Sequence, residues 1–170
     1  MPTGLKQTSS TVAIGFAATE SAANTFTQTS VDLNLSPLDR EVFVVTAINL
    51  DPVAPDAIPA TNTQVNCSLT STSNTAVANL SDANCLATAV LDIRAQGFVD
   101  SGVGFTRNGM ETPPATLDYI GIIATNDFFV SIEGANNAGP KYVSGKLYGY
   151  RAQATADIFA ALVQSEVLSA

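Results

Sequence analysis

The chain has 170 residues, 46% of them hydrophobic, which suits one folded domain with a continuous core and excludes a disordered tail. Its net charge is −8, and its seven basic residues are scattered along the sequence: Lys6, Arg40, Arg94, Arg107, Lys141, Lys146 and Arg151. Because direct nucleic-acid binding needs clustered basic residues to neutralise phosphates, we expect no direct contact with nucleic acid.

The first ten residues are polar and predict a flexible N-terminal arm, 1–10, ahead of a single domain, 11–170. The N-terminus lacks the apolar core of a secretion signal. No apolar run approaches the roughly 20 residues that span a bilayer. We therefore expect no secretion signal and no transmembrane segment.

The next segments alternate apolar and polar residues with a period of two, the pattern of strands with one buried face. Residues 31–35 predict a strand that ends at the turn signal Ser36-Pro37. Residues 41–50 begin apolar on both faces and predict a central buried strand. The stretch 52–63 contains three prolines and predicts a long stiff loop, because proline fixes φ and removes a hydrogen-bond donor.

The middle of the chain predicts four more strands, over 65–70, 77–80, 90–95 and 98–105. Ser81-Asp82 is typical of a helix cap and predicts a brief helical turn through Leu86. Asn108-Gly109 predicts a turn. Pro113-Pro114 predicts a second stiff connection.

Two strands are expected over 119–123 and 128–133. The residues between them, Thr125-Asn126-Asp127, predict a tight hairpin that joins the two strands. A loop rich in Asn and Gly, 134–140, follows the second of them.

Residues 141–154 predict a long alternating strand with three tyrosines on one face: Tyr142, Tyr148 and Tyr150. Val143 and Leu147 lie on the other face, together with Gly145 and Gly149, which indicate that another group approaches closely there. Thr155 then caps a short C-terminal helix with an apolar stripe: Ile158, Phe159, Leu162, Val163 and Val167.

These elements amount to about eight to ten strands with one or two short helices, including the C-terminal one. Regularly spaced strands without long intervening helices are typical of an antiparallel sandwich or a closed barrel. We predict an all-β fold, an antiparallel β-sandwich, over 11–170.

The cysteines Cys67 and Cys85 do not specify a disulfide at this spacing. A free cysteine behaves as a small hydrophobic residue and is often buried. We therefore expect two buried thiols, with one disulfide as the alternative if their strands are adjacent.

The chain contains no histidine, which removes the commonest general base and the usual zinc ligand. We expect no enzyme activity, no catalytic residue and no cofactor. One alternative is an enzyme with a carboxylate pair, Asp118 and Glu133, on neighbouring strands. We expect no metal ligands, although Asp82-Ala83-Asn84 or the loop with Asp51 and Asp56 offers oxygen ligands for a structural Ca²⁺. Against that, such residues commonly bond their own backbone in turns.

Charged residues make up only 13% of the chain, about half the usual share. Small neutral residues replace them, and the cores of protein interfaces are depleted in charge in the same way. With its polar arm, its Pro-containing loops (52–59 and 111–114) and this neutral composition, the chain resembles the single jelly-roll structural proteins of small icosahedral viruses.

That resemblance implies a jelly-roll sandwich in the virion that self-assembles into a capsid or shell through homo-oligomeric contacts. Its partners would be copies of itself and other virion proteins. The members of such families usually place basic residues toward the genome, and the charge of −8 departs from that pattern. A shell over an internal membrane or another protein layer, or an outer decoration protein, fits this charge better.

The contacts would then come from loops, both termini and the tyrosine face, and the residues we single out are Pro52, Pro55, Pro59, Asn136, Asn137, Tyr142, Tyr148 and Tyr150. The alternative function is a carbohydrate-binding or adhesin-like β-sandwich module on a cell surface or phage tail. In that case the tyrosines would stack against sugar rings.

Overall fold

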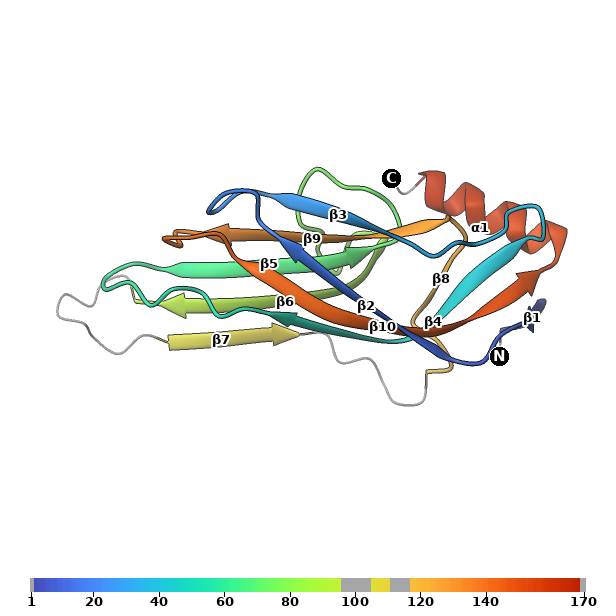
Figure 1. Ribbon diagram of the computed structural model, residues 1–170, viewed down its shortest axis with the longest axis horizontal. Helices are drawn as coiled ribbons and strands as arrows, with labels where there is room; N and C mark the ends of the chain where they lie inside the picture. The colour runs from blue at the N-terminus through green and yellow to red at the C-terminus, as the bar shows by residue number, and fades with distance from the viewer. Residues whose placement is uncertain (1, 96–104, 111–116, 169–170) are drawn as a thin grey trace.

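The computed structural model describes residues 2–95, 105–110 and 117–168. Within these ranges it contains ten strands and one helix (Figure 1): β1 (Leu5–Gln7), β2 (Val12–Thr19), β3 (Thr27–Asp32), β4 (Glu41–Pro52), β5 (Thr63–Thr70), β6 (Cys85–Arg94), β7 (Phe105–Met110), β8 (Gly121–Ile123), β9 (Asp127–Ala135), β10 (Tyr142–Ala154) and α1 (Ala156–Leu168). No helix of this described part is long and apolar enough to cross a membrane.

The strands form two five-stranded sheets that pack face to face, and every pairing is antiparallel (Figure 1). Sheet A has the order β1-β10-β4-β8, with β2 on the same edge of β10 as β1. Sheet B has the order β3-β9-β5-β6-β7. The predicted all-β antiparallel sandwich with a C-terminal helix is confirmed.

The strand pairing is nested. From the outermost pair inward, β2 pairs with β10, β3 with β9, β4 with β8, and β5 with β6. This is the pattern of one long antiparallel ribbon wrapped around a barrel axis, which defines the double-sheet jelly roll. β1 lengthens one edge of sheet A, and β7 adds a strand beside β6.

The main core lies between the sheets. It is built from every second residue along the strands, the ones that point inward, among them Phe16, Phe43, Val65, Cys67, Leu69, Phe128, Val130, Ile132, Val143 and Leu147. The rings of Phe16 and Phe128 meet edge to face at 5.7 Å. A side chain at Gly145 or Gly149 would overlap the ring of Phe16 or Phe43, with a Cβ 2.5 Å from the nearest ring atom. The predicted close approach at both glycines is therefore confirmed.

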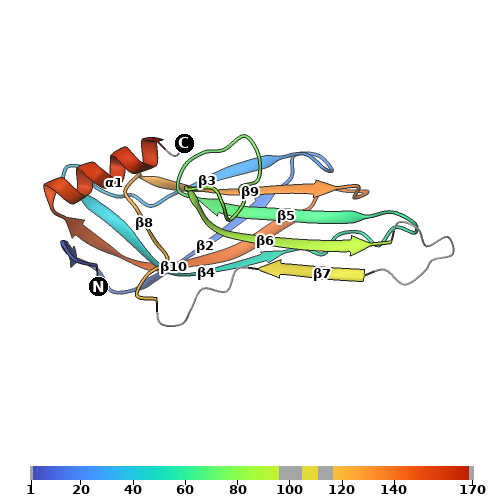
Figure 2. The ribbon, with the colours of Figure 1, turned by 180° about the vertical axis from the view of Figure 1, so that it is seen from behind.

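Helix α1 covers the outer face of sheet A at one end of the sandwich (Figures 1 and 2). Val42 and Val44 alternate with the core residues of β4 and so point outward, toward the helix. Thr155 begins the helix, because its carbonyl accepts the Phe159 N–H at 2.9 Å. Four residues of the predicted apolar stripe pack there, namely Ile158, Phe159, Leu162 and Val163. Val167 does not, since it is 67% exposed.

Part of the expected N-terminal arm is attached to the sandwich. Leu5–Gln7 form β1 in register with β10, and Leu5 is buried under α1. The two cysteines carry thiols. Cys67 is buried opposite Ala89, whereas Cys85 is half-buried and pairs with Thr70. The two cysteines lie on adjacent strands but in different rows, which separates them beyond disulfide reach.

The predicted hairpin at Thr125-Asn126-Asp127 is wrong. β8 pairs with β4 in sheet A, whereas β9 lies in sheet B between β3 and β5. The three residues therefore carry the chain from one sheet to the other. Asn126 fixes this crossing, because its backbone carbonyl accepts the Leu33 N–H (2.7 Å) and its side-chain oxygen accepts the Leu35 N–H (2.8 Å).

The predicted turn at Asn108-Gly109 is also wrong, since both residues lie inside β7 and pair with Leu91 and Val90. Pairing with β6 overrides the local turn preference. The strand predicted at 31–35 is shifted, because β3 ends at Asp32 and the positive φ of Asn34 (51°) interrupts it.

The short strand at 77–80 and the helical turn at Ser81-Asp82 are wrong as well. Both lie in an irregular loop, 71–84, in which the Ala78 N–H donates to the Ser68 hydroxyl (3.0 Å). Of the strand predicted over 98–105, only Phe105 lies within the described residues, where it begins β7. The Pro113-Pro114 connection falls outside them.

Candidate functional site

Six of the eight predicted contact residues lie together at one end of the sandwich: Pro52, Pro55, Pro59, Asn136, Asn137 and Tyr142. Three connections meet there, 20–26, 53–62 and 136–141, and we call them the loop end (left in Figure 1, right in Figure 2). Tyr148 lies further along β10, and Tyr150 lies beneath α1 at the other end. The connection 136–141 reaches the connection 53–62, although the two are far apart in sequence, because Asn137 and Ala138 hydrogen-bond to Asp56.

Three of these six residues are buried and three are exposed. Asn137 is only 5% exposed, and Pro52 and Pro55 are also buried, so these residues hold the loops together from inside. Pro59, Asn136 and Tyr142 are exposed, and Tyr142 reaches 51%. Only the second group can contact a partner.

Asn137 uses its backbone and its side chain to join all three loops. It exchanges two hydrogen bonds with Asn24, of 2.7 and 2.9 Å. Its side-chain oxygen accepts the Asp56 N–H (2.9 Å), and its amide donates to the Gln64 carbonyl (2.8 Å). The sequence singled out Asn137 as a contact residue, but its observed contacts are internal.

Glu20 is a buried carboxylate that the sequence analysis missed. It is 4% exposed and accepts three backbone N–H groups, from Gly134 (2.6 Å), Lys141 (2.6 Å) and Thr25 (3.1 Å). Three donors compensate the burial of a charged group that would otherwise be unfavourable. The signal was available, because Glu20 is the only charged residue between Lys6 and Asp32.

An ion pair adds a further connection across the loop end. The Lys141 ammonium lies 2.5 Å from a carboxylate oxygen of Asp56, and the Lys141 side chain is 10% exposed. The other Asp56 oxygen accepts the Ala138 N–H (2.9 Å). The Lys141 hydrogen bond, with that from Ala138, lowers the pKa of Asp56 below its ordinary value. The side chains of this network bind the backbone of the connections and of strands β5 and β9, so the arrangement favours rigidity over acid–base chemistry.

A second surface extends from the loop end over the outer face of sheet A. Its side chains come from β2, β4 and β10 and are mostly small and neutral: Ala13, Gly15, Ala17, Thr19, Ala47, Asn49, Asp51, Tyr142, Ser144, Lys146 and Tyr148. We call it the small-residue face. Tyr142 and Tyr148 are six residues apart on one strand, about 20 Å, so they do not form one stacking platform. Tyr150 points the same way, but α1 leaves it 8% exposed, and burial raises its pKa.

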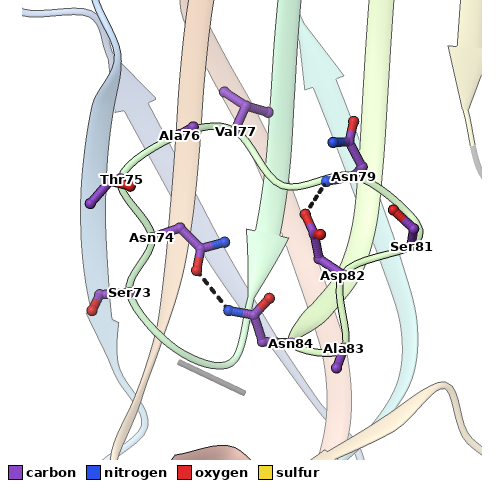
Figure 3. A pocket seen from close by; sticks show the side chains of 10 residues that line it. All are labelled: Ser73, Asn74, Thr75, Ala76, Val77, Asn79, Ser81, Asp82, Ala83 and Asn84. Atoms are coloured by element: carbon purple, nitrogen blue, oxygen red, sulfur yellow. Dashed lines mark hydrogen bonds between the residues drawn. The ribbon is translucent and has the colours of Figure 1, made fainter. Parts of the chain in front are cut away.

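A polar hollow of about 560 Å³ lies within the loop 71–84, and its walls are drawn in Figure 3. The Asn84 amide crosses the loop and donates to Thr72 and Asn74, each at 2.7 Å. Asp82 accepts the Asn79 N–H (2.7 Å), so this carboxylate closes a turn, as Asp often does. Hydroxyl and amide groups of the hollow, set among small apolar side chains, can hydrogen-bond to a polar molecule.

The suggested carboxylate pair is not assembled. Asp118 precedes β8 of sheet A, whereas Glu133 lies on β9 opposite Asn66 in sheet B. The two strands are not neighbours. Within residues 2–95, 105–110 and 117–168, no group of three Asp, Glu, Cys or His side chains is placed to hold a metal ion.

The loop end and the small-residue face meet at Tyr142, which begins β10 and whose carbonyl accepts the Val53 N–H (3.0 Å). Together they form one continuous surface with few charges, anchored by buried hydrogen bonds. Comparison with known proteins finds no matching family model, no similar curated protein and no matching solved structure.

Proposed function

We propose that this protein is a structural subunit of a virus particle, which assembles with copies of itself into a capsid or shell. Viral capsid proteins are among the established users of the double-sheet jelly roll. Because a fold alone does not determine function, the proposal depends on the surfaces. The observation that carries it is the loop end, where buried side chains fix three loops against one another.

Rigid loops favour assembly for an entropic reason. A loop that is ordered before binding loses little conformational freedom when a neighbour docks on it. Asn137 and Glu20 supply this order through hydrogen bonds to the backbone of the other loops and of strands β5 and β9. The exposed residues Pro59, Asn136 and Tyr142 are then held in fixed positions for a neighbouring subunit.

The small-residue face supplies the area that such a contact needs. Of its eleven residues only Asp51 and Lys146 are charged. Small neutral side chains lose little conformational entropy when they are ordered in a contact. They also leave few charges to desolvate, as in the cores of interfaces. With a net charge of −8, the natural neighbours are other proteins, and direct genome contact is not part of the proposal.

Light scattering and negative-stain microscopy of the purified protein test this proposal. We expect rings or closed shells for the native chain. Ala17→Lys on the small-residue face and Ala138→Lys at the loop end should leave smaller species, because each places a charge on the contact surface. Ser30→Lys, at an exposed position of β3 in the other sheet, is the matched control and should assemble normally. A native chain that stays monomeric at high concentration and at several salt levels contradicts the proposal.

A second function, carbohydrate binding by an adhesin-like module, is favoured by the hollow in loop 71–84, because hydroxyl and amide groups line it. It predicts a saturable sugar affinity that Ala76→Trp abolishes by filling the hollow. Tyr148→Ala, on the other sheet, should then leave that affinity unchanged. Loss of affinity in Tyr148→Ala alone would instead place sugar on the tyrosine face.

A further inference from the structure

A hollow of about 410 Å³ opens at the end of the sandwich opposite the loop end. The N-terminal segment, the end of β10 and the start of α1 come together there (right in Figure 1, left in Figure 2). Its walls are formed by Gly4, Leu5, Lys6, Arg40, Gln153, Ala154, Thr155 and Ala156. Two of these eight residues are basic and none is acidic, in a chain with twice as many acids as bases.

Lys6 and Arg40 form no ion pair within the described ranges, although most other basic side chains there do. Arg94 pairs with Asp92, Lys141 with Asp56, and Arg151 with Glu41. Lys6 and Arg40, both exposed, therefore line one hollow without an ion-pair partner. An anion bound between two such cations would offset their mutual repulsion.

The acids nearest to Arg40 in sequence are engaged elsewhere. Asp39 accepts the Ser36 hydroxyl (2.8 Å), and Glu41 accepts the Ser36 N–H (3.1 Å) and the Arg151 guanidinium (3.3 Å). Asp157, in the first turn of α1, is exposed and does not line the hollow. None of these three acids is among the residues that line the hollow.

The backbone of both cations is fixed. Lys6 is held in β1 opposite Gln153. Arg40 donates its N–H to the Pro37 carbonyl (3.1 Å), and its carbonyl accepts the Ala154 N–H (3.0 Å). The two side chains therefore start from defined positions on separate segments.

We propose that this hollow binds a small tetrahedral oxyanion of the phosphate class, with Lys6 and Arg40 as its charged donors. Arginine and lysine are the usual protein partners of phosphate, and their hydrogen bonds to it are charge-assisted. A bound oxyanion would join β1, the turn before β4 and the start of α1, and so add to the backbone hydrogen bonds that link these segments in pairs. The site is separate from the loop end and does not depend on the proposed function.

Inorganic phosphate added to the full chain tests the proposal, with calorimetric titration and the unfolding temperature as readouts. We expect saturable binding, and about a tenfold loss of affinity in Lys6→Gln and in Arg40→Gln, as for removal of one hydrogen bond to a charged group. Lys146→Gln is the matched control, because Lys146 is also exposed without an ion pair in the described chain but lies on the small-residue face.

Phosphate also stabilises proteins without binding, because it is excluded from their surface. That effect would raise the unfolding temperature of the native chain and all three variants equally and without saturation, and such a result overturns the proposal. A saturable response that Lys146→Gln retains and that Lys6→Gln and Arg40→Gln lose supports it. Circular dichroism of each variant without phosphate shows whether the fold is kept.

Discussion

The side-chain amide of Asn24 forms two hydrogen bonds with the backbone of Asn137, 113 positions away in the sequence. The Asn24 side chain donates to the Asn137 carbonyl and accepts the Asn137 N–H. Asn24 adopts a positive φ (58°), a conformation that Asn tolerates better than most residues. This pairing links the β2–β3 connection to the β9–β10 connection.

Asn137→Ala should destabilise the protein by about 2–4 kcal/mol, because it leaves the Asp56 N–H and the Gln64 carbonyl without their partner. Urea denaturation measures the loss. Asn136→Gly is the control, since Asn136 is exposed and its positive φ (57°) suits glycine. An equal loss in both variants would contradict the central position of Asn137.

Gly145→Ala should destabilise the protein by about 1–3 kcal/mol through overpacking. The new methyl group would lie 2.3 Å from the Asn49 carbonyl and 2.5 Å from the Phe16 ring. Gly15→Ala is a close control, because Gly15 lies opposite Lys146 on the neighbouring strand and its added methyl meets nothing within 4 Å. Thermal unfolding should therefore separate the two variants, and similar unfolding temperatures would contradict the close packing at Gly145.

The ion pair of Asp56 with Lys141 should stabilise the protein in a pH-dependent way. Because the pKa of Asp56 is lowered from 3.8 in the folded protein, its contribution is complete above that value and is lost as the pH falls through the folded pKa. Asp56→Asn should be less stable than the native chain at pH 7, and the difference should shrink below about pH 4. Denaturation curves over this range test it, and a difference that does not change with pH would contradict it.

The effect of the Glu166 carboxyl on stability should change with pH in the opposite direction. Burial raises its pKa above 4.5, although the Ala124 N–H and Thr125 hydrogen-bond to the carboxylate. Ionisation is thus disfavoured in the folded state, so stability falls as the pH rises from 4.5 through the folded pKa. Glu166→Gln keeps an oxygen for the Ala124 N–H and should be more stable than the native chain at pH 7 but not at pH 4.

The matched control for Glu166 is Asp157→Asn, an exposed carboxylate at the other end of α1. Its effect on stability should be small at both pH values. If Glu166→Gln is less stable at pH 7 than the native chain, the ionised carboxylate is the favoured form in the folded protein and the expected sign is wrong.

The local period of apolar and polar residues was enough to predict the elements that pack through a regular apolar face. β4, β5, β10 and α1 were expected close to their observed bounds, because each has at least one continuous apolar face. The errors arose where a distant segment decides the conformation. Asn108-Gly109 pairs with β6, and Asn126 is held by the backbone of Leu33 and Leu35, so neither follows its local turn preference.

The loop end could be predicted only in part. Prolines and an Asn/Gly-rich loop indicated two of its three connections. Which of their residues face inward depends on partners far away in sequence, such as Gln64 for Asn137 and Gly134 for Glu20. The same holds for Tyr150, which shares a face with Tyr142 but is covered by α1.

The position of β10 has a consequence for how the chain folds during synthesis. β10 comes last among the described strands in chain order, yet it is central in sheet A, with β1 and β2 on one edge and β4 on the other. The pairings of β10 in sheet A therefore form only after β2 and β4 have been made, and pairings of such long sequence separation are slow. Until β10 is available, β2 and β4 lack the partner that lies between them, so we expect aggregation of partly folded chains at high rates of synthesis.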